Sequence, residues 1–188
     1  MTREEIIMTC EDYDIINYTI NSDMTIDVRG DVDLFGISLD ILPLNFDRVN
    51  GDFFCHENSL TSLEGAPKYV EGNFECDFND LISLEYSPVY VGGDFICEMN
   101  YIKSLKGPKI IKGDFCCGGN LLKTFNYMPE VKRHPYFYAE KVENYDNENP
   151  IEELWRYFED KKHIDYFNEL DIIQENGEVI ILDRLNYL

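Results

Sequence analysis

Apolar and polar residues follow a fixed order that repeats four times in the middle of the chain. The shared pattern is V/I-x-G-D/N-F-x-C-x-x-N-x-L/I-x-S/T-L/F, and a proline follows each copy. The copies are Val49–Tyr69, Val70–Tyr90, Val91–Ile110 and Ile111–Glu130, and a fainter copy begins at Val28. A period of 20 or 21 residues predicts a solenoid, in which each turn buries its apolar edge against its neighbours. We therefore expect about five turns over residues 28–130.

The F-x-C segment of each repeat predicts a short strand. Its first and third side chains lie on one face, so the Phe and Cys columns should point into the core of a parallel sheet. These residues are Phe53, Cys55, Phe74, Cys76, Phe95, Cys97, Phe115 and Cys117. The residues expected to close the core from the other side are Leu60, Leu63, Leu81, Leu84, Ile102, Leu105, Leu122 and Phe125. The asparagine column, Asn58, Asn79, Asn100 and Asn120, should bond the backbone at the turn after each strand.

The segment F-x-C-x-x-N-x-L resembles the leucine-rich repeat pattern L-x-L-x-x-N-x-L, with Phe and Cys in two of the Leu places. The resemblance covers residues 28–130. The fuller pattern G-D-F-x-C-x-x-N-x-L-x-S-L is similar to uncharacterised proteins of tailed bacteriophages. This resemblance implies an α/β solenoid with a parallel sheet, a short concave surface and a phage origin, and it implies no activity.

The two ends of the chain do not carry the repeat. Residues 1–27 predict an N-terminal cap, formed by a short acidic helix or a strand pair, because the open end of a solenoid needs covering. Residues 131–148 predict a last irregular strand and a linker. Residues 149–188 predict a small α+β cap module, with helices beginning near Asn149 and over His163–Leu170. A hairpin with an Asn-Gly turn should follow, formed by Ile172–Gln174 and Val179–Leu182.

The six cysteines predict neither disulfides nor a metal centre. Four of them occupy one inward column, where parallel Cβ vectors about 4.8 Å apart suit neither a bridge nor tetrahedral zinc. They are better interpreted as small buried hydrophobic residues. Cys10 and Cys116 lie outside the column, and Cys116 should face solvent. We expect no cofactor.

Charge narrows the choice of partners. The chain has 37 acidic and 16 basic residues, and its net charge of −21 repels nucleic acid and anionic membranes. No apolar run reaches the roughly 20 residues that span a bilayer, and the N-terminus lacks the apolar region of a signal peptide. We therefore expect a cytoplasmic protein that binds neither nucleic acid nor membrane directly.

Catalysis has little support in the sequence. The three histidines, His56, His134 and His163, lie near no recognisable nucleophile, and no G-x-S-x-G, phosphate loop or H-E-x-x-H segment is present. We expect a binding protein and no catalytic residue.

Residues that flank the inward Phe and Cys should form a presented surface. The candidate protein-binding residues are Asp52, Phe54, His56, Glu75, Asp77, Asp94, Ile96 and Glu98. Asp52 and Asp94 each follow the glycine that recurs in every repeat, so the alternative interpretation is that they serve the turn there. Apolar residues inside a frame of carboxylates suit a basic protein partner with an apolar anchor.

The sequence thus predicts a non-enzymatic protein–protein interaction module. The phage resemblance together with the acidity favours inhibition or modulation of a bacterial host protein, such as a defence or nucleic-acid-processing protein with a basic patch. The alternatives are an acidic DNA mimic and a self-assembling structural component, with a small-molecule sponge or an enzyme as the most distant. Neither the partner nor the oligomeric state follows from the sequence.

Overall fold

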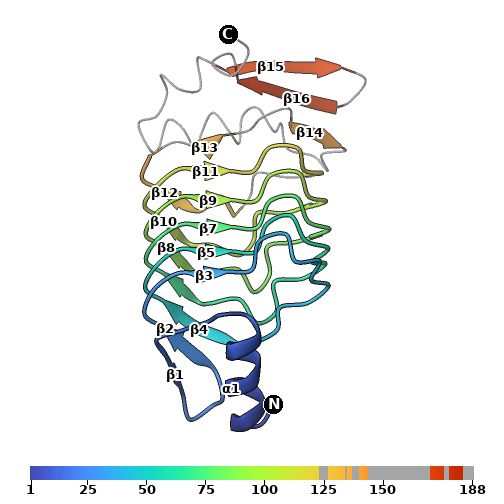
Figure 1. Ribbon diagram of the computed structural model, residues 1–188. Coiled ribbons are helices and arrows are strands. Elements are labelled where there is room, and N and C mark those ends of the chain that lie inside the picture. The colour runs from blue at the N-terminus through green and yellow to red at the C-terminus, as the bar shows by residue number, and fades with distance from the viewer. Residues whose placement is uncertain (123–126, 134, 137–139, 144–169, 176–177, 184–188) are drawn as a thin grey trace.

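The repeats coil into a solenoid built from two stacks of short parallel strands (Figure 1). The computed structural model describes the chain except for residues 123–126, 134, 137–139, 144–169, 176–177 and 184–188. Sheet B comprises β3 (Val32–Asp33), β5 (Phe53–Phe54), β7 (Phe74–Glu75), β9 (Phe95–Ile96), β11 (Phe115–Cys116) and β13 (Pro135–Tyr136). Sheet A comprises β1 (Tyr18–Ile20), β2 (Ile26–Val28), β4 (Phe46–Val49), β6 (Tyr69–Val70), β8 (Tyr90–Val91), β10 (Ile110–Ile111) and β12 (Glu130–Val131).

Sheet B confirms the predicted stacking of the F-x-C segments. Phe53 pairs with Phe74, Phe74 with Phe95 and Phe95 with Phe115, all in parallel register. The parallel β-solenoid of about five turns is therefore confirmed. The second sheet was not predicted. The Val or Ile that opens each repeat belongs to sheet A, where Val49, Val70, Val91 and Ile111 are fully buried.

The core lies between the two sheets and the leucine-bearing side of each turn. The Phe and Cys columns are fully buried, as predicted, and the Phe rings of successive turns lie 5.1–5.6 Å apart. Leu60, Leu63, Leu81 and Leu84 close the core with Ile102, Leu105 and Leu122, also as predicted. Phe125 lies outside the described residues.

The asparagine column bonds the backbone of two turns, which confirms its predicted structural role. Asn79 Oδ1 accepts a hydrogen bond from Leu60 N of the preceding turn at 2.9 Å. Asn79 Nδ2 donates to the carbonyl oxygens of Cys55, Cys76 and Asp77 at 3.0–3.2 Å. Asn58 and Asn100 make the same set of bonds one turn away.

The N-terminal segment contains both elements that the sequence offered as alternatives. Helix α1 (Arg3–Asp12) begins with a capping box, in which Thr2 and Glu5 bond each other's backbone, and it buries Ile6 and Cys10. Strand β1 then pairs antiparallel with β2, which in turn pairs parallel with β4. Figure 1 places α1 at the end of the solenoid where the first turns lie.

The C-terminal segment contains a three-stranded antiparallel sheet in the order β14-β16-β15. Its strands are β14 (Glu140–Glu143), β15 (Leu170–Glu175) and β16 (Glu178–Asp183). β15 pairs antiparallel with β16 as far as Glu175 and Glu178, which confirms the predicted strand pair. The predicted Asn-Gly turn, residues 176–177, lies outside the described residues. The helices predicted near Asn149 and over His163–Leu170 fall almost entirely outside the described residues, and Leu170 itself begins β15.

Within the described part of the chain, no helix has the length and apolar character that crossing a membrane requires.

Candidate functional site

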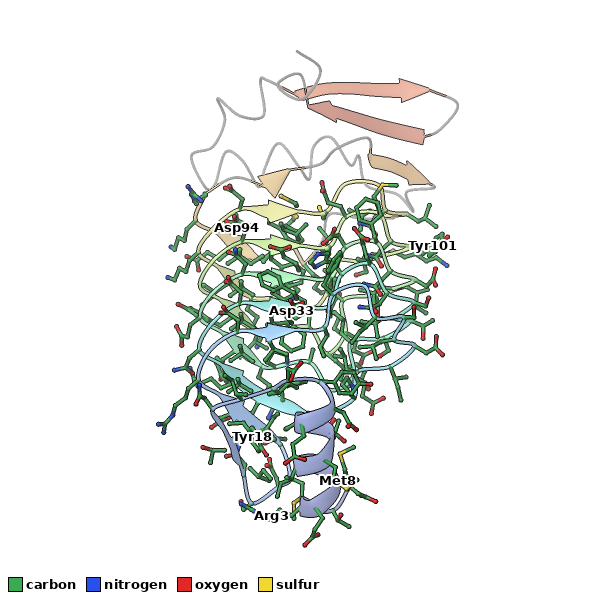
Figure 2. All side chains as sticks on the ribbon, viewed as in Figure 1. Arg3, Met8, Tyr18, Asp33, Asp94 and Tyr101 are labelled. Carbon is green, nitrogen blue, oxygen red and sulfur yellow. The ribbon has the colours of Figure 1, made fainter. Side chains whose placement is uncertain are left out.

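The open face of sheet B, meaning its surface away from the core, carries most of the residues predicted to bind a partner. Its first row is the last residue of each strand and its second row lies two residues further on, so both rows point away from the Phe and Cys columns. The first row is Asp33, Phe54, Glu75, Ile96 and Cys116. The second row is Phe35, His56, Asp77, Glu98 and Gly118. Figure 2 looks onto this face, with Asp94 and Tyr101 labelled on opposite sides of it.

His56 contacts residues of both rows. Its ring stacks on Phe35 with the centroids 4.5 Å apart, and Phe54 meets it edge-on at 6.0 Å. The Nδ1 atom of His56 lies 3.8 Å from Glu75 Oε2, which is beyond hydrogen-bond distance. This Nδ1 atom is shielded from solvent and has no hydrogen-bond partner among the described residues. The imidazole is therefore held in place mainly by aromatic contacts.

Three carboxylates on this face are partly desolvated. Burial raises the pKa of Glu75, Asp77 and Glu98 above their ordinary values. The negative charge of Asp77 raises the pKa of Glu98 further, whereas His56 opposes the rise at Glu75 and Asp77. The face thus holds negative charge that water alone solvates poorly, and a cation placed there would stabilise it.

We expect Glu98→Gln to stabilise the fold at neutral pH. Because the folded-state pKa of Glu98 is raised, its ionisation opposes folding, and this effect grows as pH rises above the ordinary value of 4.5. Urea unfolding in EDTA should therefore show Glu98→Gln more stable than the parent at pH 7. The difference should vanish below about pH 4, where the carboxyl group is protonated in both states.

Glu85→Gln is the matched control for this measurement, because Glu85 is exposed on another side of the turn. Its effect on stability should stay within about 0.5 kcal/mol at every pH. Equal pH profiles for Glu98→Gln and the parent protein would contradict the desolvation of Glu98.

Asp52 and Asp94 serve the structure of the turn, as the alternative interpretation proposed. Asp52 Oδ1 accepts a hydrogen bond from Asn73 N, and Asp94 Oδ1 accepts one from Asp114 N. A Cβ at Gly72 would approach Asp52 Oδ1 to 2.2 Å, so the glycine column makes room for this ladder. Both carboxylates lie at the edge of the open face, and Arg133 Nη1 lies 3.7 Å from Asp94 Oδ1.

An apolar edge beside the open face was missed by the sequence prediction. Phe78, Met99 and Tyr101 are 53%, 50% and 50% exposed, and they lie just beyond the second row. Phe78 and Met99 have φ angles of 49° and 51°, a left-handed conformation that is unusual for bulky residues. Glycines at the same position of other turns, Gly36 and Gly119, are the sequence signal that could have identified this place. We call Phe78, Met99 and Tyr101 the apolar edge.

A groove of about 1060 Å³ runs across the segments that lead into sheet A. Tyr86 and Tyr127 line it, and these two side chains are 57% and 64% exposed. Lys68, Lys106 and Lys109 line it together with Glu64 and Glu85, so the groove carries mixed charge, unlike the acidic open face. No candidate residue from the sequence lies in it, because its lining comes from the variable segments around the repeat prolines.

None of the six cysteines forms a disulfide, in agreement with the prediction. Burial raises the pKa of Cys55 and Cys76 well above the ordinary value for a thiol, so these side chains remain neutral. Cys116 points out from sheet B as predicted but is only partly exposed, and burial raises its pKa to about 12. Neutral thiols are poor metal ligands, which agrees with a packing role for the column.

Comparison with known proteins gives no relative for this chain. No family model, no curated protein sequence and no solved structure matches it significantly.

Proposed function

We propose that this chain is a non-enzymatic protein–protein interaction module that docks a basic partner on the open face of sheet B. The observation that carries the proposal is the combination on one surface of poorly solvated carboxylates with exposed apolar side chains. Following the leucine-rich repeat and phage resemblance of the repeats, the partner we propose is a bacterial host protein in the cytoplasm, whose activity the binding inhibits or modulates.

The charges of the open face support a basic partner. Glu75, Asp77 and Glu98 have raised pKa values because burial removes part of their hydration. Among the described residues, none of the three pairs with a lysine or arginine side chain. Guanidinium or ammonium groups of a partner would supply the missing counter-charge, and the neighbouring Phe54 and Ile96 would supply apolar contact.

The backbone conformation of the apolar edge is a second argument for docking. Holding a bulky residue in the left-handed region costs on the order of 1–3 kcal/mol, and glycine avoids most of that cost. Phe78 and Met99 accept this conformation although their side chains are half-exposed and add little to the core. A contact with a partner would explain large apolar side chains at this position.

A DNA mimic is the second candidate, because the face is acidic. Its support is weaker, since Asp52 and Asp94 are engaged in the backbone ladder and Arg133 lies beside Asp94. The two candidates differ in their response to salt. Binding by a mimic should weaken steeply between about 50 and 200 mM salt, whereas docking with an apolar anchor should persist.

The test uses the full chain and three variants of it as bait in bacterial lysate. Mass spectrometry identifies and quantifies the bound proteins, and the partner identified in this way is then purified for binding measurements. Phe54→Ala/Ile96→Ala should abolish capture of the specific partner. Phe78→Gly/Met99→Gly should weaken it, because the apolar edge is lost while the backbone conformation is preserved. Phe54→Ala/Ile96→Ala should melt within several degrees of the parent, because both side chains are only partly buried and each change should cost about 1 kcal/mol or less. Phe78→Gly/Met99→Gly should melt no lower than the parent, because glycine relieves the cost of the left-handed conformation.

Tyr86→Ala/Tyr127→Ala is the matched control, because it removes equally exposed aromatic side chains from the groove. Capture by this variant should equal that of the parent. The reverse pattern, with loss only in the groove variant, would place recognition in the groove. Sedimentation over a range of concentrations addresses self-assembly, which predicts a rising mass without any added partner.

A further inference from the structure

We propose that His56, Glu75 and Asp77 form a binding site for one divalent transition-metal ion, with Zn²⁺ as the best fit. The site lies on the open face of sheet B. The proposal shares Glu75 and Asp77 with the proposed docking face but does not depend on docking, because the three ligands belong to this chain and bind the ion without a partner.

The first support is the distance between the ligand atoms. One imidazole nitrogen of His56 and one carboxylate oxygen each of Glu75 and Asp77 lie within 4.8 Å of one another. Tetrahedral Zn²⁺ with bonds of about 2.0–2.2 Å requires its ligand atoms to be roughly 3.4 Å apart. Closing the remaining gap needs only small side-chain rotations, which are available because all three residues are partly exposed.

The second support is that the solenoid positions the ligands from two successive turns. Glu75 ends β7 and Asp77 follows two residues later, so both side chains leave the same face of the strand. His56 comes from the neighbouring turn and reaches Glu75 across the sheet. His56 and Asp77 lie in the segments just after β5 and β7, and backbone hydrogen bonds between turns, such as Glu57 N to Asp77 O at 3.1 Å, hold these segments in register.

The third support is the state of His56. Its Nδ1 atom is shielded from solvent, has no hydrogen-bond partner in the part of the chain that the structure describes, and lies 3.8 Å from Glu75 Oε2. Phe35 and Phe54 restrain the ring in this orientation. A buried polar atom without a partner is costly, and coordination of a metal ion by Nδ1 would remove that cost.

The donor set selects the class of metal. Imidazole favours Zn²⁺, Co²⁺, Ni²⁺ and Cu²⁺ over Mg²⁺ and Ca²⁺, and two carboxylates with one histidine match known zinc donor types. Water completes the coordination, because the face is open to solvent. The earlier prediction of no metal centre rested on the cysteine column, and these three ligands lie on the opposite face of the same strands.

The experiment uses the full chain, reduced and stripped with EDTA, and measures Zn²⁺ binding by competition with a chromophoric chelator. We expect one tight equivalent. Asp77→Asn and His56→Gln should each weaken that equivalent by at least about 100-fold, since losing even an outer-shell partner weakens metal binding 10- to 100-fold. Thermal melting in EDTA checks that each variant is folded, and added Zn²⁺ should raise the melting temperature of the parent but not of Asp77→Asn.

Three control variants test the assignment. Asp80→Asn changes an exposed acid of the same turn, His163→Gln removes another histidine, and Cys116→Ser removes a partly exposed thiol of the same face, so all three should bind Zn²⁺ like the parent. Bound Co²⁺ should show d–d bands without a thiolate charge-transfer band. Absence of a tight equivalent, unchanged affinity in Asp77→Asn, or loss of binding in Cys116→Ser would each overturn the proposal. Because the isolated chain is titrated, these outcomes are independent of whether a protein partner is captured.

Discussion

Phe74→Ala should lower the free energy of unfolding by about 3–5 kcal/mol, the range typical of Phe truncation in a packed core. Phe74 is fully buried at the centre of the aromatic column. Its ring lies 5.6 Å from Phe53 and 5.1 Å from Phe95, so its removal leaves a cavity between two rings that the parallel strands hold apart. Urea denaturation followed by circular dichroism measures the change directly.

Phe54→Ala is the control for this prediction, because it removes the same side chain from the opposite face of the adjacent strand. Phe54 is only partly buried, and the expected change is about 1 kcal/mol or less. Similar losses for the two variants would mean that the column does not carry the packing of the solenoid. A loss below about 1 kcal/mol for Phe74→Ala would contradict its burial.

The repeat period made the stacking of the solenoid predictable. Once turns of 20 or 21 residues stack in parallel, equivalent side chains fall in columns, and alternation along F-x-C assigns the inward face. The second sheet was not predictable in the same way. Strands β6, β8 and β10 are each two residues long. One buried Val or Ile beside a partly buried or exposed residue, as at Val70 and Tyr69, gives no alternation to detect.

The candidate surface was predictable only where strand geometry continues. Phe54, Glu75 and Ile96 lie on the open face because they alternate with buried residues. Phe78 and Met99 were missed because the backbone turns left-handed there, and alternation no longer predicts where a side chain points. The sequence could not predict that His56 approaches Glu75. This contact runs diagonally between two turns, and the ring of Phe35 stacks on His56, so both depend on how the turns pack.

Asn79→Ala should also destabilise the protein by about 3–5 kcal/mol, although it removes no large apolar group. Asn79 is 6% exposed, and its amide bonds one backbone N–H and three carbonyl oxygens. Truncation leaves Leu60 N buried without its partner. The three carbonyl oxygens each lose one hydrogen bond and keep another, Cys55 O from Asn58, Cys76 O from Asn100 and Asp77 O from Glu57 N. A buried N–H left without any partner costs about 1–3 kcal/mol, and each of the three lost bonds to the carbonyl oxygens adds about 0.5–1.5 kcal/mol.

Two further variants separate hydrogen bonding from shape. Asn50→Ala removes an exposed asparagine and should change stability by no more than about 0.5 kcal/mol. Asn79→Asp keeps the size of the side chain and the acceptor for Leu60 N, but it places a carboxylate oxygen where Nδ2 lies 3.0 Å from Cys55 O and 3.2 Å from Cys76 O. We expect strong destabilisation at pH 7 and partial recovery at low pH, where a protonated carboxyl group can donate one of the lost hydrogen bonds. If Asn79→Asp is as stable as the parent at pH 7, the column acts by filling space, and the amide ladder is not what holds successive turns together.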